Sequence, residues 1–155
     1  MDQDIILAVL KAFEEKGVLY KVVGAVAMNF LGLPRATRDL DIFVAADKDN
    51  VNRLKQALQS VFSDPVIDEI SESDLAGDYP VIQYVPPEGP FHIDIMNRLG
   101  EAFRFEDIET EVRQIEGIRV PVATPAMLYR MKKDTVRSQD KADADRLRHR
   151  FGLEE

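Results

Sequence analysis

The sequence lacks cysteine altogether and has no long apolar run. Without cysteine the chain can form neither a disulfide framework nor a thiolate metal site. The longest apolar runs, residues 5–10 and 22–28, are far shorter than the roughly 18 to 20 residues that a membrane-spanning helix needs, so we expect no membrane span. Residues 1–11 also lack the basic segment and the small-residue cleavage site of a signal peptide. The expected location is the cytoplasm.

A length of 155 residues suits one domain with a real core. The apolar share of 45% and the charged share of 31% exclude disordered and fibrous chains. We therefore predict a single domain over residues 1–155, with helices at about 125–151 packed on it.

Charge is distributed unevenly along the chain. The net charge is -8, yet residues 130–150 contain eight Lys and Arg against four Asp. The remaining chain is strongly acidic and would repel a polyanion, so we expect no broad nonspecific binding of nucleic acid. A nucleotide or an RNA should approach along the basic segment or through a bound cation, although composition alone favours an ordinary solvated helix there.

Helical and alternating patterns occur in turn along the chain. Helices are predicted over 4–16, 25–31, 125–133 and 139–151. A further helix is predicted to begin after a cap at Asp47 or Asp49 and to end near 63–65. Strands are predicted over 18–23, 40–44, 66–70, 81–85, 91–96, and a hairpin of 111–115 with 118–122. Helices at both ends and in the middle, together with a hairpin, predict an α+β (mixed α/β) fold with a mixed β-sheet flanked by helices.

The most informative stretch is 35–44, in which Asp39 and Asp41 begin a predicted strand. Because side chains alternate along a strand, both carboxylates project from one face. Like charges so close repel each other unless water or a shared divalent cation compensates them. An ordinary polar strand entry explains most isolated Asp-x-Asp pairs, so this pair alone does not establish a metal site.

A third carboxylate, Asp94, lies in the apolar strand predicted over 91–96, where a bare charge is costly to bury. If this strand lies beside the one that carries Asp39 and Asp41, three carboxylates meet on one face. They could then hold one or two Mg²⁺ (or Mn²⁺) ions together with the phosphates of a nucleotide. A hydrogen-bonded buried Asp, or one paired with Arg98, is the alternative; the cost of a bare charge favours the metal site.

Upstream, Gly24-Ala25 follows a predicted strand and begins a predicted helix. Small residues there allow close backbone approach, and free N–H groups at a helix start favour an anion such as a triphosphate. Tight helix packing explains the same residues equally well.

These residues resemble the nucleotidyltransferase superfamily of the DNA polymerase beta type. The likeness rests on Gly24-Ala25, on the loop Arg35-x-Thr37-x-Asp39-x-Asp41 and on Asp94, and it covers about residues 18–150. The ending resembles the small bacterial AbiEii-like toxin branch, with a family lysine at Lys132 and an Arg-x-x-Asp-x-x-Asp stretch at 137–143. Lincosamide nucleotidyltransferases share a similar compact layout. Where the family usually has Gly-Gly or Gly-Ser, this chain has Gly24-Ala25, which removes a hydroxyl but keeps the backbone N–H groups.

The resemblance implies a Mg²⁺-dependent enzyme that moves an NMP from an NTP such as ATP to an acceptor hydroxyl of RNA, tRNA, a protein or a small molecule. It assigns catalysis and metal binding to Asp39, Asp41 and Asp94. It assigns nucleotide binding to Gly24, Ala25, Arg35, Thr37, Arg38 and Lys132. The expected partners are the triphosphate, the acceptor and a cognate toxin or antitoxin protein.

A catalytically degenerate nucleotide-binding or partner-binding module, such as a regulator or an antitoxin, is the alternative function. Retention of three mutually repelling carboxylates favours an enzyme, because a module freed from catalysis has no physical reason to keep them. A metal-dependent phosphohydrolase uses similar carboxylates, but the glycine turn and the single Asp-x-Asp suit nucleotidyl transfer better. We expect Arg137, Asp140 and Asp143 to form an internal network that fixes the last helix.

Overall fold

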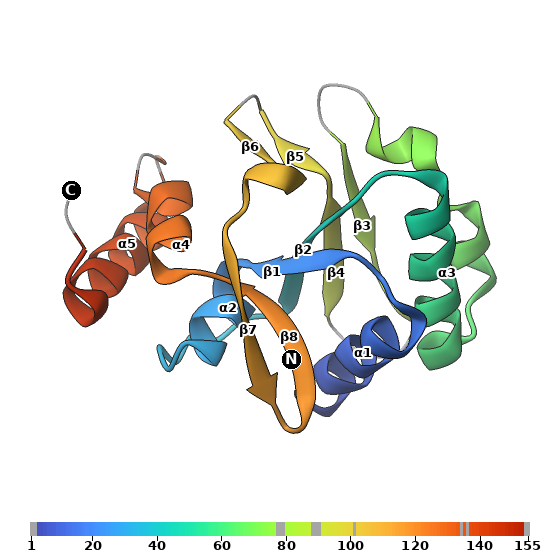
Figure 1. Ribbon diagram of the computed structural model, residues 1–155, viewed down its shortest axis with the longest axis horizontal. Helices are drawn as coiled ribbons and strands as arrows, with labels where there is room; N and C mark the ends of the chain where they lie inside the picture. Colours follow the sequence, from blue (N-terminus) through green and yellow to red (C-terminus); the bar gives the residue numbers. More distant parts are fainter. Residues whose placement is uncertain are drawn as a thin grey trace.

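The computed structural model describes residues 3–76, 80–87, 91–100, 102–133, 135 and 137–153. In this part of the chain a six-stranded sheet has the order β3-β4-β2-β1-β8-β7, and β5 and β6 form a separate two-stranded sheet (Figure 1). The strands are β1 (Tyr20–Val23), β2 (Asp39–Val44), β3 (Val81–Tyr84), β4 (His92–Met96), β5 (Arg98–Leu99), β6 (Phe103–Arg104), β7 (Thr110–Ile115) and β8 (Ile118–Ala123).

Helices lie at both ends of the sheet arrangement, and one short helix packs against its central strands. They are α1 (Gln3–Lys16), α2 (Gly24–Phe30), α3 (Lys48–Phe62), α4 (Pro125–Lys132) and α5 (Ser138–Phe151), with short 3-10 turns η1 (Pro65–Glu69), η2 (Glu72–Leu75) and η3 (Phe105–Asp107). Figure 1 shows α1 and α3 together at one end and α4 and α5 together at the other. The sheet mixes parallel pairs (β1 with β8, β2 with β4) and antiparallel pairs, which confirms the predicted fold class.

Local signals in the sequence account for most of these boundaries. The Asp47 side chain accepts a hydrogen bond from the Asn50 N–H and caps α3, which ends at Ser63 in the left-handed region (φ 50°). The predicted hairpin is confirmed as β7–β8, and its two turn residues, Glu116 and Gly117, both have positive φ (50° and 80°). That conformation suits the right-handed twist of the flanking strands.

The strand predicted over 66–70 is wrong, because this segment forms the 3-10 turn η1. Pro65 cannot donate a backbone hydrogen bond, and the Asp64 side chain accepts from the Val66 N–H, so the chain turns where a strand would extend. Ile67 is buried while Val66 is 55% exposed, which anchors the turn through one side chain.

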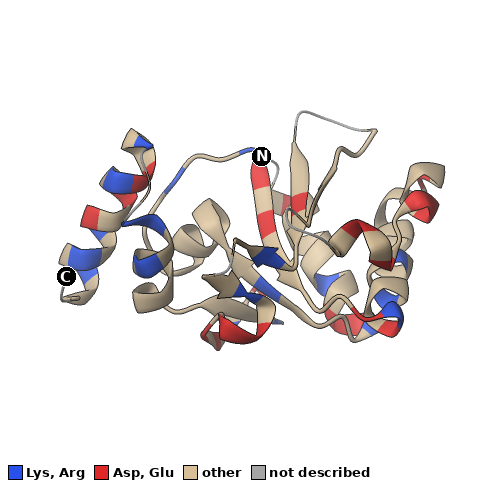
Figure 2. Cartoon of the chain, turned by 90° about the horizontal axis from the view of Figure 1, so that it is seen from above, with Lys and Arg blue, Asp and Glu red and all other residues tan. Residues whose placement is uncertain are grey.

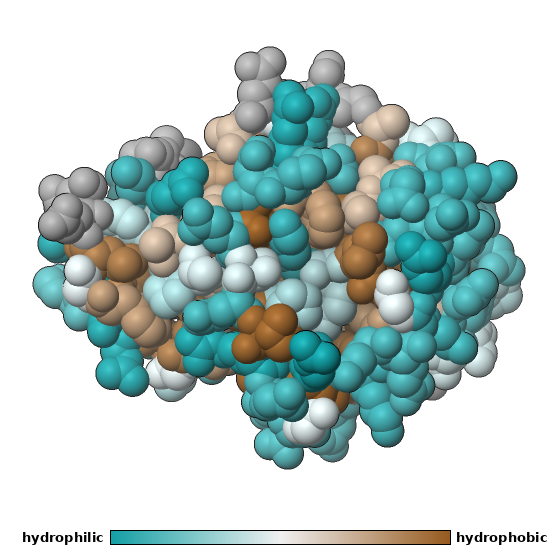
Figure 3. All heavy atoms as spheres, viewed as in Figure 1, coloured by the Kyte–Doolittle hydropathy of each residue, from teal (hydrophilic) through white to brown (hydrophobic). Residues whose placement is uncertain are grey.

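The core lies largely against one face of the central strands. Leu40 and Ile42 of β2 and Ile93 and Ile95 of β4 are fully buried, and they alternate with polar residues that point the other way. The outer surface over α3 is hydrophilic in Figure 3, where apolar residues form only small separate patches. None of the helices in the described ranges has the length and apolar character that a bilayer crossing requires.

A buried amide ties α3 to the end of the β1–β2 pair. Asn50 is fully buried, and its Oδ1 accepts a hydrogen bond from the Leu19 N–H at 2.7 Å. Its Nδ2 donates to the carbonyls of Leu19 at 3.0 Å and Ala45 at 2.8 Å. One side chain therefore satisfies the Leu19 N–H and the Ala45 carbonyl, and it shares the Leu19 carbonyl with the Ala45 N–H, which donates to it at 3.3 Å.

We expect Asn50→Ala to lower the free energy of unfolding by about 2 to 4 kcal/mol, because buried backbone groups lose their partners. Urea denaturation followed by circular dichroism measures the change. The matched control is Asn52→Ala on the exposed side of the same helix, which should shift stability by less than about 0.5 kcal/mol. Equal unfolding midpoints for the two variants would contradict the role of Asn50.

Candidate functional site

The pairing of β2 with β4 brings the predicted carboxylates together. The two strands run parallel, with Asp41 opposite Asp94 and Asp39 opposite His92. Since alternate residues share a face, all four side chains project from the same side of the sheet. In Figure 2 the acidic bands of β2 and β4 lie on neighbouring strands near the centre of the molecule.

The surroundings of the Asp41 carboxyl disfavour its ionised form. Burial is the main cause that raises its pKa from 3.8 to about 7; a hydrogen bond with Asp94 and the negative charges of Asp94 and Asp39 act in the same direction. The positive charge of Lys132 opposes them. Without a cation, the Asp41 carboxyl is therefore partly protonated near neutral pH, and the site holds less negative charge than three free carboxylates would.

His92 is a member of this cluster that the sequence analysis did not select. Its Nε2 lies 2.7 Å from Oδ1 of Asp39 and 3.6 Å from Oδ2 of Asp94. Ligand atoms of Asp39, His92 and Asp94 all lie within 4.8 Å of one another. The strand alternation that places His92 on the face of Asp94 was the available signal.

Gly24, directly after β1, lies so close to the Asp41 side chain that it leaves no room for a Cβ. Its φ is +70°, and a Cβ at this position would collide with Oδ2 of Asp41 and come within 3.2 Å of the Asp41 Cβ. Any larger residue would thus push the carboxyl out of place. Next to it, α2 begins with Val23 as its N-cap, and no side chain of the described residues caps it.

A cavity of about 550 Å³ opens between this sheet face and α4. It combines charged residues from the sheet and the C-terminal helices (Asp41, Asp94, Lys132, Arg137 and Asp140) with an apolar wall (Val81, Met96, Leu99, Leu128 and Met131). Gly24 and Gln83 complete the lining together with Val23 and Thr135. The arrangement offers oxygen ligands at one side and an apolar surface at the other.

A family model described as the nucleotidyl transferase AbiEii toxin of type IV toxin–antitoxin systems matches residues 12–151. The chain belongs to this AbiEii family. It is accordingly a nucleotidyltransferase, as its residues predicted. A comparison with curated protein sequences finds no match.

Solved structures share the fold of this AbiEii-family chain. The lincosamide antibiotic adenylyltransferase LnuA, bound to lincomycin, has a TM-score of 0.61 at 15% identity, over 96% of this chain and 97% of LnuA. ANT(2'')-Ia, in complex with adenylyl-2''-tobramycin, has a TM-score of 0.57 at 12% identity, over 97% and 91%. An antigenic nucleotidyltransferase-like protein from Paracoccidioides brasiliensis has a TM-score of 0.57 at 15% identity, over 95% and 77%. At these identities the likeness shows the fold.

Lys132, to which the resemblance assigned nucleotide binding, is held by two carboxylates of α5. Its Nζ lies 3.3 Å from Asp140 Oδ1 and 3.1 Å from Asp143 Oδ2, and its side chain is only 12% exposed. Asp143 is fully buried, and it also binds Arg35 Nε at 3.2 Å and Gln139 Nε2 at 3.0 Å. Burial acts to raise the pKa of the Asp143 carboxyl, but the hydrogen bonds and positive charges around it lower the pKa below its usual value.

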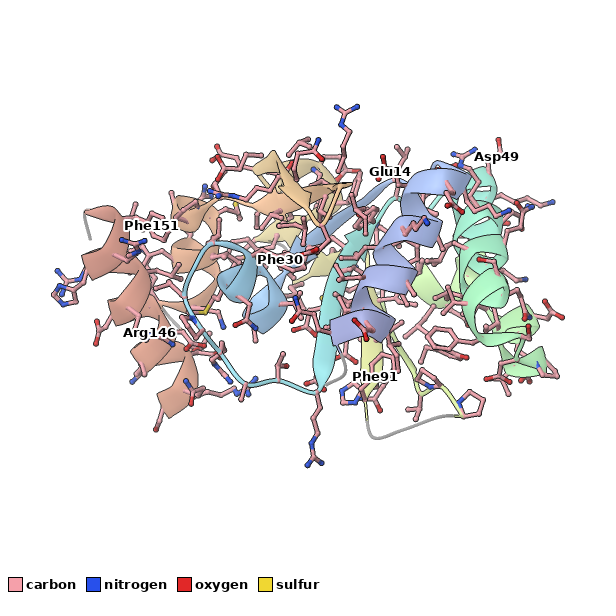
Figure 4. The ribbon with its side chains drawn as sticks, turned by 90° about the horizontal axis from the view of Figure 1, so that it is seen from below. Glu14, Phe30, Asp49, Phe91, Arg146 and Phe151 are labelled. Carbon is pink, nitrogen blue, oxygen red and sulfur yellow. The ribbon has the colours of Figure 1, made fainter. Side chains whose placement is uncertain are left out.

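The internal network expected for the C-terminal stretch is therefore present, and it reaches further than the last helix. It extends to Arg35, 108 residues away in sequence, and Arg146 also donates to the Pro34 carbonyl at 3.0 Å. Arg137 contacts Asp140 only at 3.8 Å and is mostly exposed. Figure 4 shows Arg146 on α5 beside the loop that follows α2.

Three predicted nucleotide-binding residues, Arg35, Thr37 and Arg38, do not line the cavity of Asp41 and Asp94. They line a separate cavity of about 710 Å³ between their own loop, α1 and α2. Figure 4 shows Phe30, another residue of its lining, in the space that this loop surrounds.

The polar groups of this loop also have local roles. Arg35 donates to Asp143, and the Thr37 hydroxyl accepts a hydrogen bond from the Asp39 N–H at 3.0 Å. These contacts shape the loop that leads into the acidic strand. Ala25 is buried and does not line the cavity of Asp41 and Asp94 either.

The residues of this AbiEii-family site fit a divalent cation. Three carboxylates supply the oxygen ligands that Mg²⁺ and Mn²⁺ prefer. Burial, and then the neighbouring charges of Asp94 and Asp39, raise the pKa of Asp41, and a bound cation would act against these effects. Gly24 leaves room for the Asp41 carboxyl where any side chain would displace it.

We expect Gly24→Ala to displace the Asp41 carboxyl, and so to weaken Mg²⁺ binding more than tenfold in isothermal titration, on the scale of outer-shell changes at metal sites. Gly100→Ala is the matched control, because Gly100 also has positive φ (59°) but a Cβ there meets nothing within 4 Å. The Gly100→Ala variant therefore introduces only the backbone strain of a non-glycine residue at positive φ, about 1 kcal/mol. Equal Mg²⁺ affinity in the two variants would refute the steric argument.

The raised pKa of Asp41 also predicts how stability depends on pH without metal. Because the folded state favours the protonated carboxyl, its contribution is complete below about pH 4 and is lost as pH rises through about 7. With a chelator present, we expect Tm of the wild type to fall between pH 5 and 8, and to fall by several °C more than Tm of Asp41→Asn does. A shift of this size corresponds to a change of a few kcal/mol in the free energy of unfolding, on the order expected for a domain of this length. Parallel Tm curves for the two proteins would show that Asp41 titrates normally.

Proposed function

We propose that this AbiEii-family chain uses a divalent metal to transfer an NMP from an NTP to an acceptor hydroxyl, and that the carboxylates of β2 and β4 are its catalytic centre. One observation carries the proposal: the register of two parallel strands sets Asp41 opposite Asp94 in the lining of a cavity, with Asp39 on the same face. Like charges held this close, and only partly exposed to water, are costly unless a cation compensates them.

In this proposal Asp39, Asp41 and Asp94 hold the metal. When bound, the metal neutralises charge on the triphosphate and polarises the attacking hydroxyl. Asp94 takes the proton of the acceptor hydroxyl as its oxygen bonds to the α-phosphorus. The bond between the α-phosphorus and the bridging oxygen of the β-phosphate breaks, and pyrophosphate leaves with that electron pair.

Backbone and side-chain groups of the cavity orient the triphosphate. The Gly24 turn and the first N–H groups of α2 bring backbone donors close to Asp41, and the ammonium of Lys132 adds positive charge on the opposite wall. Arg35 and Thr37 act on this site indirectly, by fixing the loop in front of Asp39.

The proposed acceptor classes and the proposed biological role are taken from the family description and from the fold neighbours. The family description makes this chain a candidate toxin with a cognate antitoxin, active where NTPs are found, in the cytoplasm. The fold neighbours carry small-molecule ligands, lincomycin and an adenylylated tobramycin, so antibiotics belong among the acceptors to be screened beside RNA, tRNA and protein.

The test incubates the protein with each α-³²P-labelled NTP, Mg²⁺ or Mn²⁺, and total RNA, tRNA, bacterial protein or antibiotic acceptors. We expect label transfer and pyrophosphate release with one acceptor class, and a loss of at least about 1,000-fold for Asp41→Asn and Asp94→Asn, because the charge that holds the metal is removed. Asp145→Asn, an exposed Asp on α5, is the control and should keep full activity.

Binding is measured separately from turnover. Titration of Mg-ATP or Mg-GTP should give heat with the wild type and none with the Asp39→Ala/Asp41→Ala double variant. Unchanged heat in the double variant would refute the site. Nucleotide binding without transfer to any acceptor would favour the non-catalytic module.

A further inference from the structure

We propose that His92 is a ligand of the metal in this site, through its Nε2, and that this nitrogen makes Mn²⁺ the preferred ion over Mg²⁺. The inference rests on the proposed function, because it assumes that the carboxylates of β2 and β4 hold a divalent ion. It goes beyond the proposed function in two respects. It adds a nitrogen ligand to the carboxylate oxygens, and it predicts which of the two ions binds more tightly.

The distances around Nε2 are those of neighbouring ligands on one ion. An ion with octahedral bonds of about 2.1 Å separates adjacent ligand atoms by about 3.0 Å. Nε2 lies 2.7 Å from Asp39 Oδ1 and 3.6 Å from Asp94 Oδ2, on either side of that value. Small rotations of these side chains would place all three atoms around one centre.

The strand register fixes the imidazole in this position. His92 is paired with Asp39 across β2 and β4 and lies two residues before Asp94, so the sheet itself aims all three side chains to one side. The His92 side chain is 28% exposed and the Asp94 side chain 22%, so both can be reached from solvent. A histidine that served the core would lie on the other face, with Ile93 and Ile95.

In the metal-free protein, Nε2 of His92 contacts Oδ1 of Asp39 at 2.7 Å. To bind the ion, the neutral imidazole keeps its proton on Nδ1 and presents the Nε2 lone pair. The competing arrangement leaves His92 outside the coordination sphere, where its N–H only orients Asp39. The two arrangements differ in whether a nitrogen touches the metal.

The choice of ion follows from the donor atoms. Mg²⁺ prefers oxygen and keeps water in preference to other ligands, whereas imidazole binds the first-row transition ions well. Mn²⁺ accepts carboxylates as readily as Mg²⁺ does and gains from a nitrogen ligand. An imidazole beside the carboxylates of Asp39 and Asp94 therefore favours Mn²⁺ over Mg²⁺.

The decisive measurement is pulsed EPR of Mn²⁺ bound to the full chain without nucleotide. We expect modulation from a directly bonded ¹⁴N in the wild type, and its disappearance in His92→Gln. The chain has only one other histidine, His149, which is exposed on α5, so His149→Gln is the matched control and should keep the signal. Absence of the ¹⁴N signal from the wild type, or its persistence in His92→Gln, would overturn the proposal.

Titrations with Mn²⁺ and Mg²⁺ alone measure the preference. The wild type should bind Mn²⁺ at least about tenfold more tightly than Mg²⁺, and His92→Gln should lose most of that difference chiefly through weaker Mn²⁺ binding. An equal loss of affinity for both ions would assign His92 to the orientation of Asp39 and reject it as a ligand.

Asp41→Asn separates this inference from the proposed function. If it abolishes binding of both ions while His92→Gln changes neither, only the role of His92 fails. If Asp41→Asn retains both affinities, the carboxylate site itself is refuted.

Discussion

The parallel pairing of β2 with β4 is the constraint on which the rest of the site depends. It sets Asp41 directly across from Asp94, so the charge of the Asp41 carboxyl must be compensated by a proton or by a cation. The opposite face of the same strands carries Leu40, Ile42 and Ile95, whose burial stabilises the sheet that holds the carboxyls in place. Core and site are thus two faces of one pair of strands.

The C-terminal helices control the positive charge near those carboxyls. The hydrogen-bond partners of Lys132 among the described residues lie on α5, at Asp140 and Asp143, so its ammonium is close enough to influence Asp41 without forming an ion pair with it. The buried Asp143 in turn needs both Lys132 and Arg35, because a single buried charge without partners is strongly destabilising. The network therefore couples the cavity wall to the loop that precedes the acidic strand.

Sequence reasoning predicted much of this architecture where local chemistry decides it. Alternation placed Asp39 and Asp41 on one face, and the apolar surroundings of Asp94 indicated a compensating partner. Strand order was not predictable from such signals, because the pairing of β2 with β4 joins segments some fifty residues apart. The destination of Arg35 was missed for the same reason, and the turn at 65–69 was missed because Pro65 and Asp64 override an apolar run that reads as a strand.

The contact between Arg35 and Asp143 also bears on synthesis of the protein. The loop after α2 acquires its buried counter-ion from α5, so a nascent chain on the ribosome has an incomplete loop and an unanchored Lys132 until α5 has emerged. This order delays organisation of the cavity that Lys132 lines until α5 has been synthesised. Loss of the last helix by proteolysis would reverse the same step and return the loop to its unassembled state.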